Sequence, residues 1–363
     1  MEYVKLEDVC EILDSQRVPI TASERKSGIY PYYGANGIQD YVEDYIFDDD
    51  LVLLAEDGGN FGSKEKPIAY RVSGKCWVNN HAHVLKPKSC VNVDYLCYSL
   101  MFYDTAGLVN GATRQKLTQA SMRQMQIPLL NIEEQKKIVN ELNFLVDLID
   151  KRKQQLSKLD ELVKARFVEL FGDPKYNKSS LVKIGEIGVL TSGGTPSRAK
   201  PEYFEGDIRW YSAGELNSLY LPDSVEHISE TALQQSSAKL FNKGTLMIGM
   251  YDTAAFKMGI LTEDSSSNQA CANLNPKRGY NIVWLYYLFD IMKPIFLQER
   301  QGVRQKNLSL SKIKEFEVPF APFELQNQFA TFVEQTDKSK LEVQKSLEKL
   351  ELLKKALMQK YFE

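Results

Sequence analysis

Residues 132–171 read IEEQKKIVNELNFLVDLIDKRKQQLSKLDELVKARFVELF, a stretch with neither proline nor glycine. Leu142, Ile149, Leu156 and Val163 follow one another at intervals of seven residues. This heptad repeat predicts one long helix with an apolar seam and a charged outer face. At 1.5 Å per residue, a helix of roughly 37 of these residues is about 55 Å long, which exceeds the width of a small domain. It therefore requires an equally long partner.

A second stretch, residues 323–362, repeats the first with a shift of 191 residues and indicates an internal duplication. The preferred interpretation is an antiparallel helix pair within the one chain. The alternative is that each helix is directed at a separate partner. The matching positions are Pro128 with Pro319, Glu133 with Glu324, Gln135 with Gln326, Leu156 with Leu347, Leu159 with Leu350, Leu162 with Leu353, Ala165 with Ala356 and Phe171 with Phe362.

The seam of the second helix is less apolar than that of the first. Thr336, Lys340 and Lys354 stand where the shift would place seam residues. We therefore expect its contact face to be shorter, or displaced toward neighbouring apolar positions. The residues expected to pack in the helix pair are Leu142, Leu145, Ile149, Leu156, Leu159 and Val163 in the first helix, and Val343, Leu347, Leu350, Leu353 and Leu357 in the second.

The duplication extends into the region before each helix. Val4-Lys5-Leu6 matches Val182-Lys183-Ile184, and Arg114-Gln115-Lys116 matches Arg304-Gln305-Lys306, whereas most other positions differ. Such a pattern is expected when one scaffold carries two different recognition surfaces. The predicted fold class is α+β, with two globular α/β domains, two long antiparallel helices and a pseudo-twofold duplication. The expected segments are residues 1–131 (first domain), 132–171 (first helix), 172–180 (linker), 181–322 (second domain) and 323–363 (second helix).

Composition places few limits on function. The net charge of −3 over 363 residues gives no electrostatic sign of nucleic acid binding, so a DNA-binding role needs local basic patches or a partner. No apolar run is long enough to span a membrane, and the first residues do not resemble a signal peptide. Five cysteines without a Cys-x-x-Cys pair are typical of reduced thiols, so the cytoplasm is the expected location.

A stand-alone enzyme, such as a fused methylase and nuclease, is disfavoured because its motifs are missing. The string at residues 275–278, Asn-Pro-Lys-Arg, lacks the Pro-Pro-aromatic sequence that adenine methylation requires. Residues 58–64 end in Gly-Ser-Lys, whereas a phosphate-binding loop needs Gly-Lys-Ser or Gly-Lys-Thr. His81 and His83 could share one face of a strand as zinc ligands. No second pair has ligand spacing, so we expect core or DNA-facing histidines and no metal.

Two stretches carry a family resemblance. Residues 191–197, Thr-Ser-Gly-Gly-Thr-Pro-Ser, followed by Tyr203-Phe204 and Trp210, resemble the opening of a target recognition domain. Residues 32–38, Tyr-Tyr-Gly-Ala-Asn-Gly-Ile, with the later Asp57-Gly58, resemble another variety of the same domain. Together with the duplicated helices, they make the whole chain similar to the specificity subunit of a type I restriction–modification system.

That resemblance implies a non-catalytic subunit. Each domain would read one half of a bipartite site on double-stranded DNA, and the helix pair would set the gap between the halves. Two methyltransferase subunits would dock on the chain, and two motor–nuclease restriction subunits could join them. S-adenosylmethionine, ATP and Mg would be bound by those partners, with no cofactor in this chain. The competing interpretation is a coiled-coil scaffold with two protein-binding heads.

Residue type suggests which side chains contact DNA. Arginine, asparagine and glutamine read guanine and adenine bidentately, whereas lysine mainly binds phosphate. The repeated Arg-Gln-Lys strings combine both types, and an ordinary surface loop is the competing interpretation of each candidate. The predicted DNA-binding residues are Tyr32, Tyr33, Asn36, Lys64, Arg71, Arg114, Gln115, Lys116, Ser192, Thr195, Arg198, Lys257, Arg304, Gln305 and Lys306.

Overall fold

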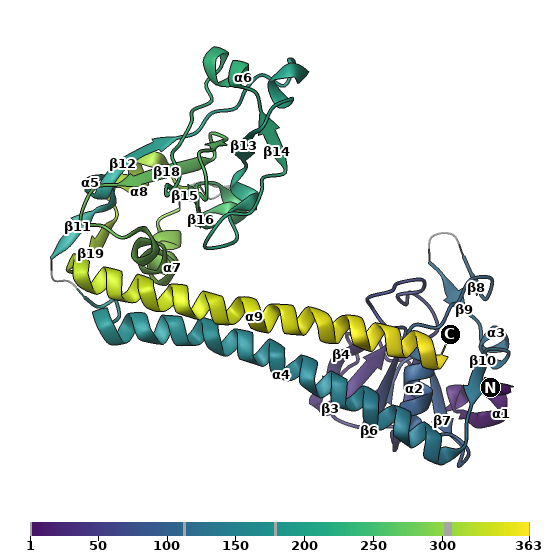
Figure 1. Cartoon of the computed structure of the whole chain (residues 1–363). Helices are drawn as coiled ribbons and strands as arrows, with labels where there is room; N and C mark the ends of the chain where they lie inside the picture. The colour runs from purple at the N-terminus through teal and green to yellow at the C-terminus, as the bar shows by residue number, and fades with distance from the viewer. Residues whose placement is uncertain (1, 112–113, 178–179, 301–306, 363) are drawn as a thin grey trace. The chain divides into compact units, whose positions relative to one another are not determined.

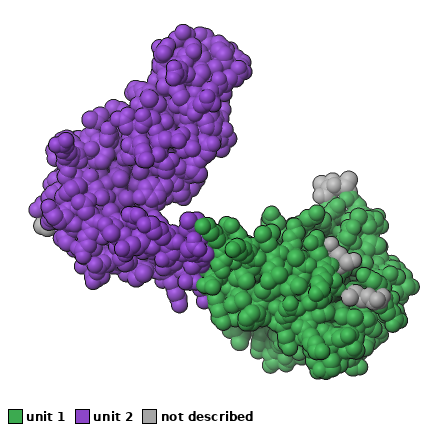
Figure 2. All heavy atoms as spheres, viewed as in Figure 1, with its two compact units in different colours: residues 1–153, 345–363 green, residues 154–344 purple. Residues whose placement is uncertain are grey.

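The computed structural model describes residues 2–111, 114–177, 180–300 and 307–362 (Figure 1). The chain forms two compact units, Met1–Lys153 with Lys345–Glu363 and Gln154–Gln344 (Figure 2). Each unit contains one globular domain and one end of each long helix, α4 (Ile132–Phe171) and α9 (Phe323–Phe362). The predicted α+β class with two domains and two long helices is confirmed. Among the described residues, no helix is both long enough and apolar enough to cross a membrane.

The first domain is built on a six-stranded sheet with the order β2-β7-β5-β6-β3-β4. The central strand β5 ends in the run Leu51–Ala55, which is completely buried, because both faces of the strand are covered. β1 pairs antiparallel with β10 beside the start of α4. The elements are β1 (Glu2–Lys5), α1 (Leu6–Val9), β2 (Cys10–Ile12), η1 (Asp14–Gln16), β3 (Ser27–Gly34), β4 (Gly37–Val42), β5 (Phe47–Ala55), β6 (Ala69–Val78), β7 (Ala82–Pro87), α2 (Val93–Met101), β8 (Val109–Asn110), β9 (Lys116–Leu117), α3 (Gln119–Arg123) and β10 (Gln126–Leu129).

The second domain repeats this topology. Its four-stranded sheet has the order β12-β18-β15-β16, which matches β2-β7-β5-β6, and β11 pairs with β19 as β1 pairs with β10. The elements are β11 (Leu181–Lys183), α5 (Ile184–Ile187), β12 (Gly188–Ser192), η2 (Pro201–Phe204), β13 (Ile208–Tyr211), η3 (Ala213–Glu215), β14 (Glu226–Ile228), α6 (Glu230–Gln235), β15 (Leu246–Gly249), η4 (Asp252–Ala254), β16 (Met258–Ile260), β17 (Ser266–Ser267), β18 (Cys271–Pro276), α7 (Ile282–Gln298), α8 (Leu310–Glu315) and β19 (Glu317–Pro319).

The two domains also match in the pairing of strands whose sequences show no similarity. In the first domain β3 pairs parallel with β6, with Tyr32 opposite Trp77. In the second domain β13 pairs parallel with β17, with Trp210 opposite Ser266. β3 also pairs antiparallel with β4, as β13 does with β14. The scaffold is therefore shared more completely than the sequence indicates, although β14, β13 and β17 form a separate three-stranded sheet, whereas the six strands of the first domain form one sheet.

The helix pair is antiparallel, because the first unit contains the start of α4 with the end of α9 and the second unit contains the opposite ends. Most of the predicted seam residues are buried or half-buried. Leu156, Leu159, Leu350 and Leu357 are half-buried. The prediction is wrong for Leu353, which is 47% exposed. The fully buried members of the predicted seam are Leu142, Leu145, Ile149, Val163, Val343 and Leu347.

The seam of α9 keeps the shifted heptad positions despite their polar residues. Thr336 is buried and donates its hydroxyl to the Phe332 carbonyl at 2.9 Å, so its polar group is satisfied within the helix. The ammonium of Lys340 lies 2.6 Å from the Asp160 carboxylate, while its side chain is only 22% exposed. Burial lowers the pKa of Lys354. Lysine stems can cover apolar surface while their charged ends reach polar neighbours, which explains why the seam is not displaced toward Leu353.

The ends of the two helices have matching anchors. Phe171 packs against Trp284 with ring centroids 5.9 Å apart, and Phe362 packs against Tyr95 at 5.2 Å. Phe171 and Phe362 are equivalent in the duplication, as are the helices α7 and α2 that carry their partners. Each long helix therefore ends on an aromatic contact with a globular domain.

A repeated glutamine joins each long helix to its domain. Gln135 is fully buried, and its Oε1 accepts a hydrogen bond from the backbone N–H of Asn92 at 2.8 Å. Its Nε2 donates to the carbonyls of Cys90 and Leu130 at 3.0 and 2.8 Å. Asn92 is the N-cap of α2. One amide side chain thus satisfies three backbone groups at the junction.

Gln326 makes the same set of bonds in the second unit. Its Oε1 accepts from the N–H of Asn281, the N-cap of α7, at 2.8 Å. Its Nε2 donates to the carbonyls of Gly279 at 3.3 Å and Ala321 at 2.7 Å. The glutamine of the repeated Glu-x-Gln string is therefore a structural joint between helix and domain.

Candidate nucleic-acid interface

In the first domain, four loops bring charged and polar side chains together beyond the end of β5. The guanidinium of Arg114 donates to Oδ1 of Asp57 at 2.7 Å. Nδ1 of His81 lies 2.6 Å from the same oxygen. Asn36, in the turn between β3 and β4, donates from Nδ2 to the carbonyl of Gly58 at 3.0 Å. The structure thus unites the predicted residues Asn36 and Arg114 with Asp57, which was not predicted as a DNA contact, and with His81, which was expected to be a core or DNA-facing histidine.

Gly58 allows the close approach of Arg114. It has φ +64°, in the left-handed region that favours glycine. A Cβ at this position would lie 3.3 Å from Nε of Arg114. The backbone N–H of Gly58 donates to the Gln115 carbonyl at 3.1 Å. The side chains of Arg114, Gln115 and Lys116 are exposed, so all three remain candidates for DNA contact.

Beneath this cluster lies a buried charged network. His83 is fully buried, with Nδ1 2.7 Å from Oδ2 of Asp14 and Nε2 2.9 Å from the Leu117 carbonyl. Both ring nitrogens therefore have an oxygen within hydrogen-bond distance. Burial alone would raise the pKa of Asp14. Hydrogen bonds from His83, the Val84 N–H and Gln119 outweigh burial and hold that pKa below its usual value.

The oxygens of Asp14 and Glu56 lie within metal-ligand reach of His83, with all three ligand atoms within 4.8 Å of one another. Arg17 nevertheless lies 2.6 Å from Oε2 of Glu56, and Lys116 lies 3.1 Å from Oε1. Because these cations already neutralise Glu56, the donor set does not fit a divalent ion. His81 and His83 bind different carboxylates, so the structure does not support a zinc pair.

The structure corrects the role of two predicted residues in the first domain. Tyr32 is 1% exposed and donates its hydroxyl to the Ile20 carbonyl at 3.2 Å, so it belongs to the core and its prediction as a DNA contact is wrong. Arg71 pairs with Asp50 at 3.0 Å and Asp94 at 2.7 Å, which links β6 to β5 and α2. That arrangement indicates a structural role for Arg71.

The other two candidates of the first domain differ in exposure. Tyr33 is half-buried against Tyr70, with ring centroids 5.8 Å apart. Lys64 is exposed and stays a prediction.

Among the described residues of the second domain, those lining the equivalent end of the sheet are mainly neutral. Thr195 donates its hydroxyl to Gln269, and Lys257 lies 3.5 Å from the Gly214 carbonyl. A cavity of about 430 Å³ opens beside the predicted residue Ser192. It is lined by Ser192, Met250, Tyr251, Gln269, Glu299, Asn307, Leu308, Ser309, Leu310 and Lys312.

Arg198 lies farther along the loop after β12. Its guanidinium forms a two-pronged ion pair with Glu226 and lies over the ring of Phe204, 4.2 Å from the centroid. The predicted residues Arg304, Gln305 and Lys306 lie outside the described residues.

The residues that the sequence missed follow from strand equivalence. Asp57 comes two residues after β5, and Tyr251 comes two residues after β15. Gly58 and Asp252, the next residues, both have positive φ, +64° and +46°. A polar turn directly after a buried strand was the available signal, but its neighbours Arg114 and His81 are distant in sequence.

Comparison with known proteins gives a consistent picture. A family model described as the type I restriction modification DNA specificity domain matches residues 1–161 and again 177–352. A putative type I restriction enzyme specificity subunit of Haemophilus influenzae is 28% identical over 333 residues, covering 86% of this chain and 82% of that protein. The specificity subunit of the Methanocaldococcus jannaschii type I restriction enzyme MjaIX is 31% identical over 160 residues, covering 43% of this chain and 37% of that protein.

Solved structures show the same fold. The type I restriction–modification S subunit from M. genitalium superposes with a TM-score of 0.60 at 14% identity, over 100% of this chain and 96% of that chain. A chain from a study of complex assembly and conformational transition of the type I R-M system gives 0.61 at 16% identity, over 100% and 97%. At these identities the structural similarity concerns the fold alone.

Proposed function

The chain belongs to the type I restriction–modification DNA specificity family, and we propose that each of its two domains reads one half of a split DNA site. It is the non-catalytic specificity subunit, and catalysis takes place on partner subunits. One observation carries the proposal: the strand order β2-β7-β5-β6 of the first domain recurs as β12-β18-β15-β16 in the second, yet the loops after β5 and β15 differ in sequence. Two different reading surfaces on one scaffold fit two different half-sites.

The helix pair supplies the distance between the half-sites in this proposal. α4 and α9 have 40 residues each, so each is about 60 Å long. Major-groove faces on the same side of a duplex recur about every 34 Å. In this proposal, helices of this length are long enough to separate two half-sites read on the same side of the duplex.

The most direct test is to map modified bases. The chain is co-expressed with its methyltransferase partner, and the host DNA is sequenced for methylated adenine. We expect a bipartite motif of two short half-sites around a gap of constant length. Absence of any new modification, with the same partner shown to be active beside another specificity subunit, would support the protein-binding scaffold instead.

We further propose that two methyltransferase subunits dock on the outer faces of the helices. Leu162 and Leu353 are equivalent in the duplication and are 49% and 47% exposed. Ala165 and Ala356, one turn farther along, are exposed as well. A duplicated apolar patch offers two like surfaces to two like partners. In this proposal the partners bring S-adenosylmethionine, and restriction subunits that join bring ATP and Mg.

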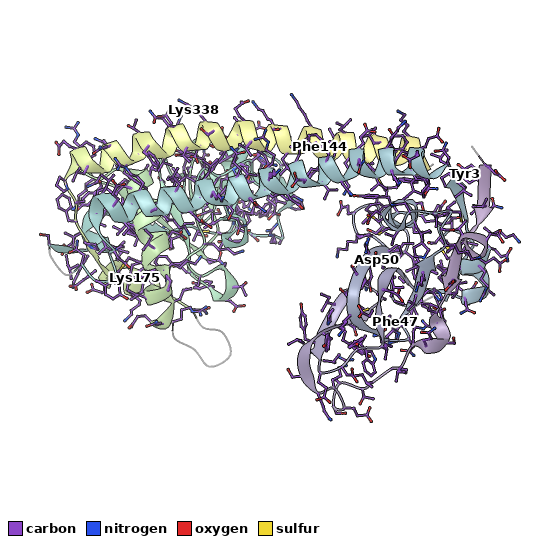
Figure 3. All side chains as sticks on the ribbon, turned by 90° about the horizontal axis from the view of Figure 1, so that it is seen from below. Tyr3, Phe47, Asp50, Phe144, Lys175 and Lys338 are labelled. Atoms are coloured by element: carbon purple, nitrogen blue, oxygen red, sulfur yellow. The ribbon has the colours of Figure 1, made fainter. Side chains whose placement is uncertain are left out.

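Single substitutions test this stoichiometry. Leu162→Glu and Leu353→Glu are each expected to reduce the complex from two methyltransferases to one, and the double variant to abolish docking, as measured by native mass spectrometry. Leu352→Glu is the matched control, because Leu352 is 68% exposed and its equivalent in α4 is already Glu161. Unchanged stoichiometry in both single variants would place the docking surface elsewhere on the chain. Exposed Phe144 on α4 is the next position to replace (Figure 3).

A further inference from the structure

Arg114 is an exposed arginine whose guanidinium is held on one side. The exposed fraction of its side chain is 60%, whereas that of Asp57 is 19%. Oδ1 of Asp57 lies 2.7 Å from the guanidinium and 2.6 Å from Nδ1 of His81. One carboxylate oxygen thus contacts both side chains, and Nδ1 of His81 also lies 3.4 Å from the guanidinium of Arg114. These contacts hold the carboxylate and, through it, the arginine. The remaining guanidinium donors stay available to a ligand.

The backbone around this group is fixed as well. The N–H of Leu117 donates to the Glu56 carbonyl at 2.7 Å, and the N–H of Glu56 donates to the His81 carbonyl at 2.9 Å. Nδ2 of Asn36 donates a hydrogen bond to the carbonyl of Gly58 at 3.0 Å. The turn between β3 and β4, the turn after β5, the turn before β7 and the segment before β9 are therefore joined around Arg114. Little conformational freedom has to be lost when a ligand binds.

The local charge distinguishes base reading from phosphate binding. The Asp57 carboxylate offsets most of the attraction that Arg114 would exert on a phosphate, since phosphate affinity depends on uncompensated positive charge. Lys116 is likewise paired with Glu56 at 3.1 Å. Orientation, in contrast, is what a bidentate contact to O6 and N7 of guanine demands. The Asp57 carboxylate orients the guanidinium and leaves the N–H groups that do not contact it free to reach a base edge.

We propose that Arg114 reads a guanine in the half-site of the first domain, and that Asp57 and His81 are positioning residues that orient its guanidinium. This inference rests on the function proposed above. Asp57 does not touch the base. Asp57 instead favours the side-chain rotamer of Arg114 in which two guanidinium N–H groups reach the same base edge. Loss of Asp57 should therefore change base preference more than overall affinity.

The test measures base preference in the complete complex of this chain with its methyltransferase partner. Single-turnover methylation is compared on duplexes that carry each base in turn at every position of both half-sites. Arg114→Lys keeps the charge and removes the planar fork, and we expect it to lower discrimination for guanine at one position roughly 10-fold to 100-fold. Asp57→Asn and His81→Gln are expected to lower discrimination at that same position by a smaller factor, with the other half-site unchanged.

The matched control is Asp50→Asn (Figure 3). Asp50 lies on β5 and pairs with Arg71 on β6 at 3.0 Å, so this variant alters another arginine–carboxylate pair of the same domain. It should leave all base preferences as they are. Equal loss of methylation across all sequences in Arg114→Lys and Asp57→Asn would show a phosphate contact and overturn the inference. Unchanged base preference in both variants would overturn it as well. If the unaltered complex shows no bipartite motif, the proposed function itself is wrong.

Discussion

Replacing Asp14 by alanine is expected to destabilise the first unit by about 3–5 kcal/mol, because it leaves three hydrogen-bonding groups, on His83, Val84 and Gln119, without their carboxylate partner. His83 is fully buried, and its Nδ1 lies 2.7 Å from the Asp14 carboxylate. Asp14 also accepts from the N–H of Val84 at 2.9 Å and from Gln119 at 2.9 Å. The substitution therefore removes three hydrogen bonds and one charge at a site that water does not reach.

This effect should depend on pH in a defined direction. The pKa of Asp14 in the folded protein is lowered from its ordinary value of 3.8, so folding favours the ionised carboxylate. The contribution of the ionised Asp14 carboxylate to stability is therefore fully present from about one pH unit above 3.8 upward. It is lost as the pH falls through the lowered pKa of the folded protein. The stability difference between the wild type and Asp14→Ala should accordingly shrink in acid.

Urea unfolding, followed by hydrogen exchange in peptides from residues 69–87, measures the change within the first unit. Asp147→Ala is a suitable control, since Asp147 is 55% exposed and forms an exposed pair with Lys151. Such pairs contribute at most about 1 kcal/mol. A loss in Asp14→Ala no larger than in the control, or a loss that stays constant down to pH 3, would contradict the role assigned to the network.

Replacing Gln326 by leucine is expected to cost about 2–4 kcal/mol in the second unit, because it leaves one N–H and two carbonyls without partners at the start of α9. The carbonyl of Ala321, which accepts at 2.7 Å, belongs to a buried residue. The equivalent Gln135→Leu should destabilise the first unit by a smaller amount, because Cys90, whose carbonyl it binds, is exposed and water can replace the side chain there.

Thermal and urea unfolding of both variants, with hydrogen exchange resolved by unit, would measure the two effects separately. Gln328→Leu serves as the control on the same helix, because Gln328 is exposed. If Gln326→Leu and Gln328→Leu lose equal stability, the buried amide does not act as the joint. If each variant loosens the opposite unit instead of its own, the assignment of one glutamine to each domain is wrong.

The long helices and the duplication could be predicted from the sequence. Leu142, Ile149 and Val163 are buried as expected, because the heptad repeat is a local property that any helix of this sequence must display. Residues equivalent by the shift of 191 also proved equivalent in three dimensions. Gln135 and Gln326 make the same three bonds, although only their repetition, and not their function as joints, was visible in the sequence.

Part of the candidate interface could not be predicted. Tyr32 follows the alternation of a strand and points into the core, and the composition of its loop gave no sign of this. Residue type also misled for Leu353, since α9 retains Lys340 and Lys354 in the seam and leaves that leucine exposed. In both cases packing against elements distant in sequence overrides local preference.

By itself, then, the sequence determined the helix pair, the two-domain organisation and the family, because periodicity, repetition and motif order are properties of neighbouring or regularly spaced residues. Only the tertiary structure decided which side chains form the interface. Arg114 meets Asp57 and His81 because β5 ends where β7 and β9 begin in the first domain. Such a meeting depends on the pairing of distant strands, which no local pattern specifies.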